Sequence, residues 1–299
     1  MSGPISRRAR LASASPVAGP LDLGEAIKGP SALSGGWRRT LQLTVAIARN
    51  DFKLRFFGSA LGYVWQLMRP LMLFSVLYVV FTQIVPLGGE LENFPVALLL
   101  GIVLFTFFAE ATSGAVSCVV DRENLVRKIH FPRVVIPLAV VLTASFNLLL
   151  NLVVVVIFAL ANGVDPSLGW LGLPPLLILL ALFATGMSML LSALYVRYRD
   201  VQPIWDVVLQ ITFYGSLILV PYETIRDKHE VLASGLVANP LAAVLQEARH
   251  LVVDPGYASA ADAIGGGIRL IVPLGVAIGA FLLGLWVFNR EAPRIAEEL

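Results

Sequence analysis

Charged side chains are scarce in this sequence, and their scarcity excludes most classes of soluble protein. Asp, Glu, Lys and Arg make up 14% of the 299 residues, hydrophobic residues make up 57%, and the mean hydropathy is +0.80. Soluble domains carry about 25% charged residues. The composition therefore indicates an integral membrane protein, and a net charge of +2 gives no reason to expect a nucleic-acid partner.

Residues that build metal and catalytic sites are equally rare. Cys118 is the single cysteine, which excludes a disulfide within the chain and a cysteine metal site. His130, His229 and His250 stand at no metal-ligand spacing, and the hydrolase motifs H-E-x-x-H and G-x-S-x-G are absent. The Gly-rich loop of P-loop nucleotide-binding proteins is absent too. We therefore expect no enzyme activity and no cofactor in this chain.

Long apolar runs fill most of the sequence. A helix that crosses a bilayer needs about 20 apolar residues, and six segments meet this requirement: 61–85, 94–120, 134–160, 171–196, 201–220 and 268–288. We predict an all-α polytopic membrane protein with six transmembrane helices in a permease domain at 58–290. Residues 1–36, rich in Ser, Ala, Gly and Pro, are expected to form a disordered cytoplasmic tail, and 291–299 a short cytoplasmic C-terminal tail.

Residues 37–57 have the pattern of an amphipathic helix. Leu41, Ala48 and Phe52 fall on one face, while Arg49 and Lys53 fall on the other. A basic amphipathic helix is typical of the membrane interface. A helix of a small soluble domain is the alternative, but the chain offers no other soluble segment to pack it.

The distribution of positive charge predicts the orientation. Loops rich in Lys and Arg stay in the cytoplasm, and with the N-terminus inside, 18 of the 22 Lys and Arg residues lie there, if Arg69 is taken to reach the cytoplasmic headgroups. We therefore expect both termini in the cytoplasm and the chain in the plasma membrane. The external segment 221–267 is predicted to hold a short re-entrant helix over 241–253, capped near Asn239.

A charged island at 121–137 separates the second and third predicted spans. Asp121 is placed to cap a brief helix, which Pro132 ends. Leu125 and Ile129 share one face of that helix because they are four residues apart. A helix with an apolar face on the cytoplasmic side predicts a docking site for a partner protein.

Glu110 is the one acid deep inside a predicted span. An ionisable group there is costly, so it faces either a protein interior or a wet path. One interpretation is a buttress bonded to Thr112 or Ser113, and the other is a residue that lines a path. Phe105, Phe108 and Tyr214 also allow two interpretations: they pack in the core, or they contact a sugar. The motif Gly275-x-x-x-Gly279 is typical of close helix packing, and we expect it to pack helices within the chain; the alternative is a dimer seam.

Arg249 lies on the predicted external helix. A guanidinium can bind a phosphate through paired hydrogen bonds, which would suit a diphosphate carrier lipid. The alternative is that Arg249 pairs with Glu247, Asp254 or a lipid phosphate and anchors the helix.

Four stretches together resemble a known family. They are DFKLRFFGSALGYVWQLMRPL at 51–71, LVRKIHFPR at 125–133, LSALYVRYRDV at 191–201 and NPLAAVLQEAR at 239–249. In order and spacing they resemble the transmembrane subunit of ABC exporters of lipid-linked polysaccharides, such as O-antigen, capsule and teichoic acid. The resemblance covers about residues 40–290. Glu110 departs from it, because a small or neutral residue is usual there, and the tail before residue 37 is longer than in many members.

The resemblance implies a function, partners and site residues. Two copies would pair, two separate ATPase subunits would bind ATP and Mg²⁺, and a glycan on a polyprenyl carrier would cross the plasma membrane, among membrane lipids. The implied ATPase contacts are Leu125, Val126, Arg127, Lys128, Ile129, His130, Phe131, Arg197, Tyr198, Arg199 and Asp200. The implied interfacial-helix residues are Arg49, Asp51, Phe52, Lys53 and Arg55.

Two other functions stay open at this point. An ABC exporter of a drug or small lipid would share the topology but is not expected to carry the FPR and RYRD motifs found here. A membrane-embedded glycosyl or acyl transferase would need acidic or histidine clusters at a membrane face, and this sequence has isolated ones.

Overall fold

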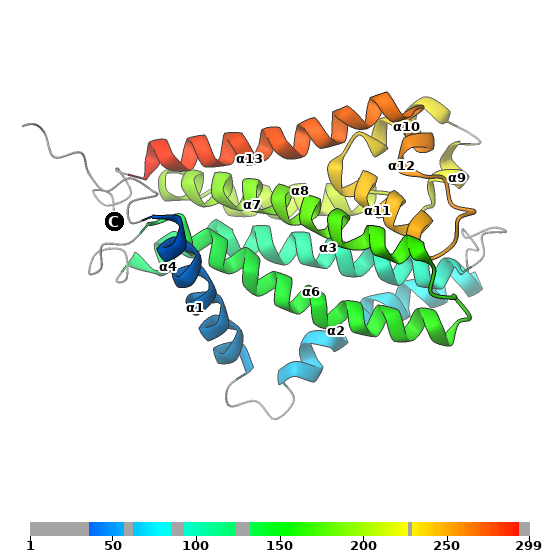
Figure 1. Cartoon of the computed structure of the whole chain (residues 1–299), viewed down its shortest axis with the longest axis horizontal. Coiled ribbons are helices and arrows are strands. Elements are labelled where there is room, and N and C mark those ends of the chain that lie inside the picture. The colour runs from blue at the N-terminus through cyan, green and yellow to red at the C-terminus, as the bar shows by residue number, and fades with distance from the viewer. Residues whose placement is uncertain (1–35, 57–61, 85–92, 124–131, 227–228, 293–299) are drawn as a thin grey trace, which may run out of the picture.

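Long helices run side by side through the molecule, and short helices gather at one end of it (Figure 1). The computed structural model describes residues 36–56, 62–84, 93–123, 132–226 and 229–292, and every regular element in these ranges is helical. In chain order they are α1 (Trp37–Phe56), α2 (Gly62–Val79) with the π-helical turn η1 (Val80–Ile84), α3 (Phe94–Val116), α4 (Cys118–Asp121), α6 (Val135–Ala161), the 3-10 turn η2 (Leu168–Gly172), α7 (Leu173–Arg197), α8 (Val201–Gly215), α9 (Tyr222–Arg226), α10 (Glu230–Val237), α11 (Pro240–Val252), α12 (Ala260–Ala263), the 3-10 turn η3 (Gly267–Leu270) and α13 (Ile271–Glu291).

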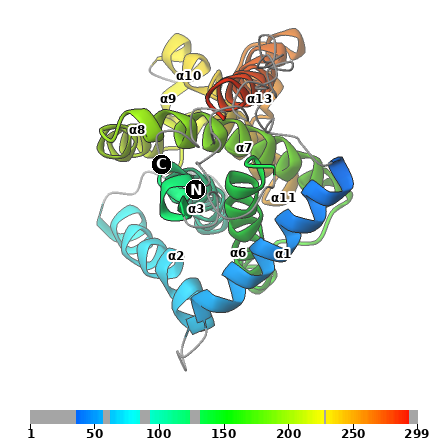
Figure 2. The same ribbon diagram turned by 90° about the vertical axis from the view of Figure 1, so that its left-hand side faces the viewer.

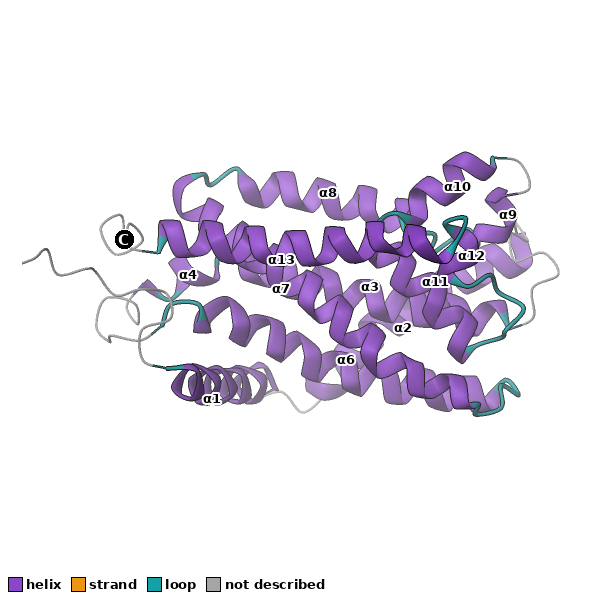
Figure 3. Cartoon of the chain, turned by 45° about the horizontal axis from the view of Figure 1, so that its top comes forward, coloured by secondary structure: helices purple, strands orange, loops and turns teal. Residues whose placement is uncertain are grey.

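Four helices in the described ranges are long and apolar enough to cross a membrane: α3, α6, α7 with η2, and α13 with η3. Helices α10 and α11 are bent by 99° at their junction and would raise the number to five if they counted as one broken span. The helical, multi-pass membrane architecture predicted from the sequence is therefore confirmed. Figure 3 shows that helices make up nearly all of the described chain.

Helix α8 is shorter than the predicted span 201–220. It ends at Gly215, and at 15 residues it is about 22 Å long, which falls short of a ~30 Å hydrocarbon core. Leu217 has a φ of 60°, a left-handed conformation that a right-handed helix cannot contain. The chain stays buried beyond this break, because Ser216, Leu217 and Ile218 are at most 2% exposed.

Helix α3 is the centre of the bundle. It packs against α2, α6, α7, α8 and α11, and Figure 2 shows it enclosed between α2, α6, α7 and α8. Its apolar residues are distributed around the whole helix, and 72% of its most apolar stretch is buried. A helix that is hydrophobic on every side is buried in the core, and this explains why α3 lies inside the bundle.

Helix α13 packs along α7 through two glycines. A Cβ atom on Gly284 would lie 2.1 Å from the carbonyl oxygen of Gly186, and one on Gly186 would lie 2.5 Å from the Cα of Phe281. Gly275 and Gly279 have no atoms within 4 Å of such a Cβ. The predicted intrachain role of the Gly275-x-x-x-Gly279 motif is therefore wrong, because the close contact forms two turns further along α13.

The two ends of the bundle differ. Helices α9 to α12 lie at one end, and α1 and α4 lie at the other (Figure 1). The predicted helix over 241–253 is confirmed as α11, with Pro240 at its first position and the Asn239 Oδ1 accepting a hydrogen bond from the Leu241 amide at 3.0 Å.

The glycine contact gives a test of the fold. Gly284→Leu forces α13 away from the backbone of α7, so we expect the thermal unfolding midpoint in detergent to drop, with a destabilisation of about 3 kcal/mol or more. Gly275→Leu adds the same side chain to the same helix in open space and serves as the control. Equal midpoints for the two variants would contradict the assigned packing.

Candidate functional site

The residues predicted to contact an ATPase lie in two places. Leu125 to Phe131 fall outside the described residues. Arg197 is the last residue of α7, and Tyr198 to Asp200 form the turn after it, near the α4 end of the bundle because α4 packs against α7. The Arg197 guanidinium lies 5.4 Å from the ring centroid of Tyr198, and that of Arg199 lies 5.0 Å from the ring centroid of Tyr195. Both are within the range of cation–π contact.

Helix α1 lies diagonally across α6 (Figure 2). Ala48 is fully buried, and the rings of Phe52 and Phe146 meet edge to face with centroids 5.6 Å apart. Arg49 and Lys53 are exposed on the other side of the helix. The predicted helix is therefore present, and Ala48 and Phe52 of its apolar face pack on the bundle, whereas Leu41 of the same face is 49% exposed.

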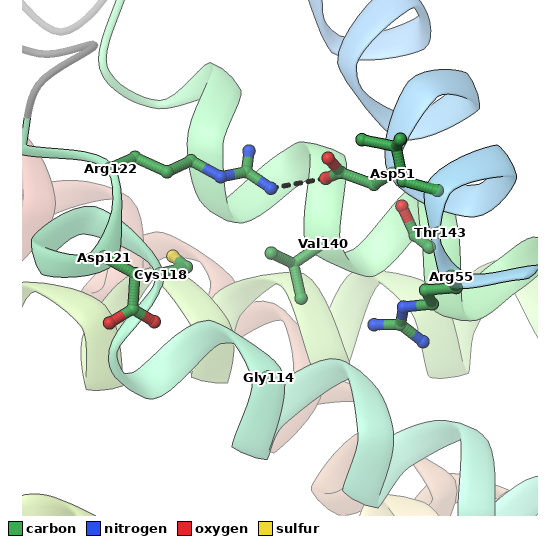
Figure 4. Close-up of a pocket in the computed structure, with 9 residues that line it drawn as sticks. Asp51, Arg55, Gly114, Cys118, Asp121, Arg122, Val140 and Thr143 are labelled. Carbon is green, nitrogen blue, oxygen red and sulfur yellow. Dashed lines mark hydrogen bonds and ion pairs between the residues drawn. The ribbon is translucent and has the colours of Figure 1, made fainter. Parts of the chain in front are cut away.

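The C-terminal half of α1 forms two ion pairs. Asp51 pairs with Arg122, which follows α4, and Arg55 pairs with Glu110 on α3. The four side chains are partly exposed, between 20% and 40%. Figure 4 shows Arg122 extending across to Asp51, with Arg55 further along α1.

Glu110 is the meeting point of four helices. Besides Arg55, it accepts hydrogen bonds from the Nδ2 of Asn147 on α6 at 2.7 Å and from the Nε2 of Gln66 on α2 at 3.4 Å. The expected partner Thr112 is turned away, because its hydroxyl donates to the Phe108 carbonyl and accepts from the Trp205 indole at 3.0 Å. The prediction that Glu110 bonds to Thr112 or Ser113 is therefore wrong, because three polar groups from α1, α2 and α6 surround this carboxylate.

Three cavities follow one another along α3 and share lining residues. The first is about 440 Å³, lies between α1 and the α3, α4 and α6 helices, and is polar (Figure 4). The second is about 500 Å³ and shares Arg55 and Gly114 with the first. The third is about 410 Å³ and shares Leu73, Phe105 and Ala109 with the second. We call these three adjoining cavities, which are lined by α1, α2, α3, α4, α6 and α8, the α3 recess.

The predicted path residues divide between the α3 recess and the core. Glu110 and Phe105 line the recess, as does Tyr214, which is 71% exposed. Phe213 joins them, with ring centroids 4.9 Å from Phe105 and 5.4 Å from Tyr214. Phe108 lies in the core instead, stacked on Phe183 at 5.1 Å and 2% exposed.

Arg249 lies inside the protein. It is 1% exposed, and its Nη2 donates to the carbonyl of Ile218 at 3.0 Å. That carbonyl belongs to the segment after α8, where the helix break leaves backbone acceptors without helical partners. Glu247, an expected partner, accepts from the amide of Ala260 at 2.8 Å. Arg249 thus bonds the non-helical end of α8, an interaction that no local sequence signal could have predicted.

These features define a multi-pass membrane protein organised around a recess. Among the described residues, no three His, Cys, Asp or Glu side chains form a group that could hold a metal ion. Residues 42–251 match the ABC-2 type transporter family, and the chain belongs to this family. It is therefore the membrane subunit of a transporter.

The relatives carry names from polysaccharide export. An O-antigen export system permease protein RfbA of Klebsiella pneumoniae is 28% identical over 86% of this chain and 95% of its own length. The protein of the same name from Myxococcus xanthus is 28% identical over 68% of this chain and 77% of its own length. The polysialic acid transport protein KpsM of Escherichia coli is 23% identical over 72% of this chain and 82% of its own length.

The single cysteine gives a test of the first cavity. Burial raises the pKa of the Cys118 thiol to about 12, and because the thiolate is the reactive form, a maleimide at pH 7.5 should react at least about 100-fold more slowly than with an ordinary surface thiol. Lys53→Cys in a Cys118→Ala chain supplies that surface thiol. Between pH 9 and 11 the control rate should level off while the Cys118 rate keeps rising. Equal rates at pH 7.5 would contradict the burial of Cys118.

Proposed function

We propose that this chain is the permease subunit of an ABC exporter that moves a polyprenyl-linked polysaccharide, of the O-antigen, galactan or teichoic acid type, across the plasma membrane. The observation that carries the proposal is the likeness to an O-antigen export permease over 86% of this chain. Membership of the ABC-2 type transporter family supports it. The α3 recess adds a surface on which such a substrate could lie.

The proposed topology has six spans with both termini in the cytoplasm. Helices α2 and α8 would complete the set with α3, α6, α7 and α13, while α1 would lie in the membrane interface after the 1–36 tail. Helix α8 can serve as a short span because its non-helical end is buried, and irregular backbone is tolerated at membrane depth when protein surrounds it. The positive charges near α1 and α4 support a cytoplasmic position for that end.

The proposed partners are two ATPase subunits and a second copy of this chain. The ATPases would bind ATP and Mg²⁺ and would dock on residues 125–131 and on the turn from Arg197 to Asp200. Helices α2 and α8, which line the α3 recess, carry exposed apolar residues such as Val76 and Ile211, 63% and 66% exposed. A second copy would cover these residues and form a shared path.

The proposed path combines stacking surfaces with polar groups. Phe105, Phe213 and Tyr214 form one aromatic cluster on the wall of the recess, and rings of this kind offer flat faces to sugars. Glu110 and Gln66 supply polar atoms further along the same recess. We propose Glu110, Phe105 and Tyr214 as substrate contacts, while Phe108 and Arg249 would act from within the core.

Replacement of two apolar residues by aspartate tests the proposal that residues 125–131 receive the ATPase. Leu125→Asp combined with Ile129→Asp places two charges in the proposed interface, where an unpaired charge costs several kcal/mol. We expect the chain to reach the membrane at normal abundance, to lose co-purification with its ATPase, and to lose export, so that the carrier-linked glycan accumulates on the inner side. Val231→Asp with Leu232→Asp, at the opposite end of the bundle, is the control. Retained co-purification and export would rule the assignment out.

A further inference from the structure

A cavity of about 340 Å³ lies where α11 and α12 meet α7 and α13, at the end of the bundle that carries the short helices (Figure 1). Its wall is mostly apolar and comes from all four helices, with residues such as Leu179, Val244, Ala260 and Leu274. Of the lining residues that the structure describes, none is shared with the α3 recess. We call this space the α11 cavity. Its volume is within the range of small-molecule sites, about 300–1,000 Å³.

The packing of α7 against α13 explains why this space is left open. Gly186 and Gly284 bring the backbones of the two helices into contact. Further toward α11, Leu179 and Leu274 line the cavity from the two helices in place of glycines. Helix α11 packs against both helices, but it presents the small side chain of Ala243 to the cavity. Protein interiors rarely leave a void of this size unfilled, so an occupant has to be sought.

The polar side chains of the cavity wall are already bonded. The Oε2 of Glu247 accepts a hydrogen bond from the Ala260 amide at 2.8 Å. The Ser259 hydroxyl donates to the Oδ2 of Asp262 at 2.7 Å and accepts from the Asp262 amide at 3.1 Å. Both side chains thus serve the first turn of α12, whose amides have no partner within the helix. Because a buried water needs about two to four polar partners, the α11 cavity suits hydrocarbon better than water.

The bilayer is the nearest source of hydrocarbon. Leu179 belongs to the segment of η2 and α7, and Leu274 to that of η3 and α13, and both segments are long and apolar enough to cross a membrane. Leu274 is exposed, and so is Ile271 one turn before it. The wall of the cavity therefore continues into an apolar surface that lipid chains would cover.

A cation stands beside the cavity. Arg269 is exposed and directly precedes Leu270, which lines the wall. Its Nη1 donates to the Ile264 carbonyl at 3.3 Å, and a Cβ atom on Gly265 would lie 2.7 Å from the same nitrogen. The guanidinium therefore lies over the turn between α12 and η3. A guanidinium carries five N–H donors, so Arg269 can also bind a phosphate.

We propose that the α11 cavity holds one acyl chain of a membrane phospholipid, with the phosphate of that lipid on Arg269. The chain fills the space that the alanines of α11 and α12 leave open, and it holds these two helices against α7 and α13. A phospholipid is favoured over the glycan carrier because the cavity lies outside the α3 recess. The site does not depend on the proposed function.

Photolabelling in lipid nanodiscs tests this proposal. The discs contain phosphatidylethanolamine and phosphatidylglycerol, with a trace of phosphatidylethanolamine that carries a diazirine near the end of one acyl chain. After irradiation, peptide mass spectrometry should find adducts on Val244, which is 2% exposed and out of reach of lipid unless a chain enters the cavity. Ile157, an exposed residue of α6, gives the reference labelling. Adducts on Ile157 without any on Val244 would overturn the proposal.

Two substitutions fill the cavity from different walls. Ala243→Phe and Ala261→Phe should each lower the labelling of Val244 at least about tenfold, because the ring takes up the volume that the chain needs, and the labelling of Ile157 should not change. Gly279→Phe adds the same ring to α13 in open space and is the matched control. Full labelling of Val244 in both filled variants, at the unfolding midpoint of the parent, would show that the chain lies elsewhere.

The head group and the kind of lipid are tested in the same discs. Arg269→Gln should lower the labelling of Val244 about threefold and Arg269→Lys should retain it, because an exposed ion pair adds modestly to binding. Equal labelling in Arg269→Gln would contradict the phosphate contact. A polyprenyl phosphate that carries a diazirine, used at the same fraction, should label Val244 less than the phospholipid does. Stronger labelling by the polyprenyl phosphate would assign the cavity to a carrier lipid and overturn the proposal.

Discussion

A carboxylate inside an apolar helix bundle must find polar partners, and in this molecule that carboxylate is Glu110. Its neighbours Arg55, Gln66 and Asn147 come from α1, α2 and α6, so the requirement to solvate one side chain brings three helices onto α3. Helix α1 packs mainly along α6. The ion pairs of Arg55 with Glu110 and of Asp51 with Arg122 add polar connections from α1 to α3 and to the residue after α4.

The same principle operates at the opposite end of the bundle. Helix α8 breaks at Leu217, and the backbone beyond it is buried. Arg249 from α11 donates to the Ile218 carbonyl, while the Nδ2 of Asn239 lies 3.3 Å from the Ser216 hydroxyl. Polar side chains from a sequence-distant helix thus compensate for a broken one, as buried backbone requires. The α3 recess includes the first of these polar junctions, because Glu110 and Arg55 line it, and its aromatic cluster includes Phe105 further along α3.

The long helices could be predicted because a bilayer imposes a length and an apolar composition that hydropathy detects directly. The ends of α6, α7 and α13 fall within a few residues of the predicted spans. The partners of Glu110 could not be predicted, since residues 55, 66 and 147 are brought to it by tertiary packing. The end of α8 was missed for the same reason: a long-range bond from Arg249 supports a backbone conformation that the sequence 216–220 does not signal. The motif Gly275-x-x-x-Gly279 was misleading because spacing alone does not say which face meets a neighbour.

Arg55 and Glu110 stabilise the structure as a pair, and a double-mutant cycle measures the coupling free energy between the two side chains directly. Arg55→Gln removes the cation beside Glu110, which keeps the hydrogen bonds from Asn147 and Gln66. Glu110→Gln removes the carboxylate beside Arg55, and the double variant leaves neither charge behind. Thermal unfolding in detergent should show that the loss in the double variant is smaller than the sum of the single losses, with a coupling of about 1 kcal/mol or more. Strictly additive losses would show that Arg55 and Glu110 do not stabilise the structure as a pair.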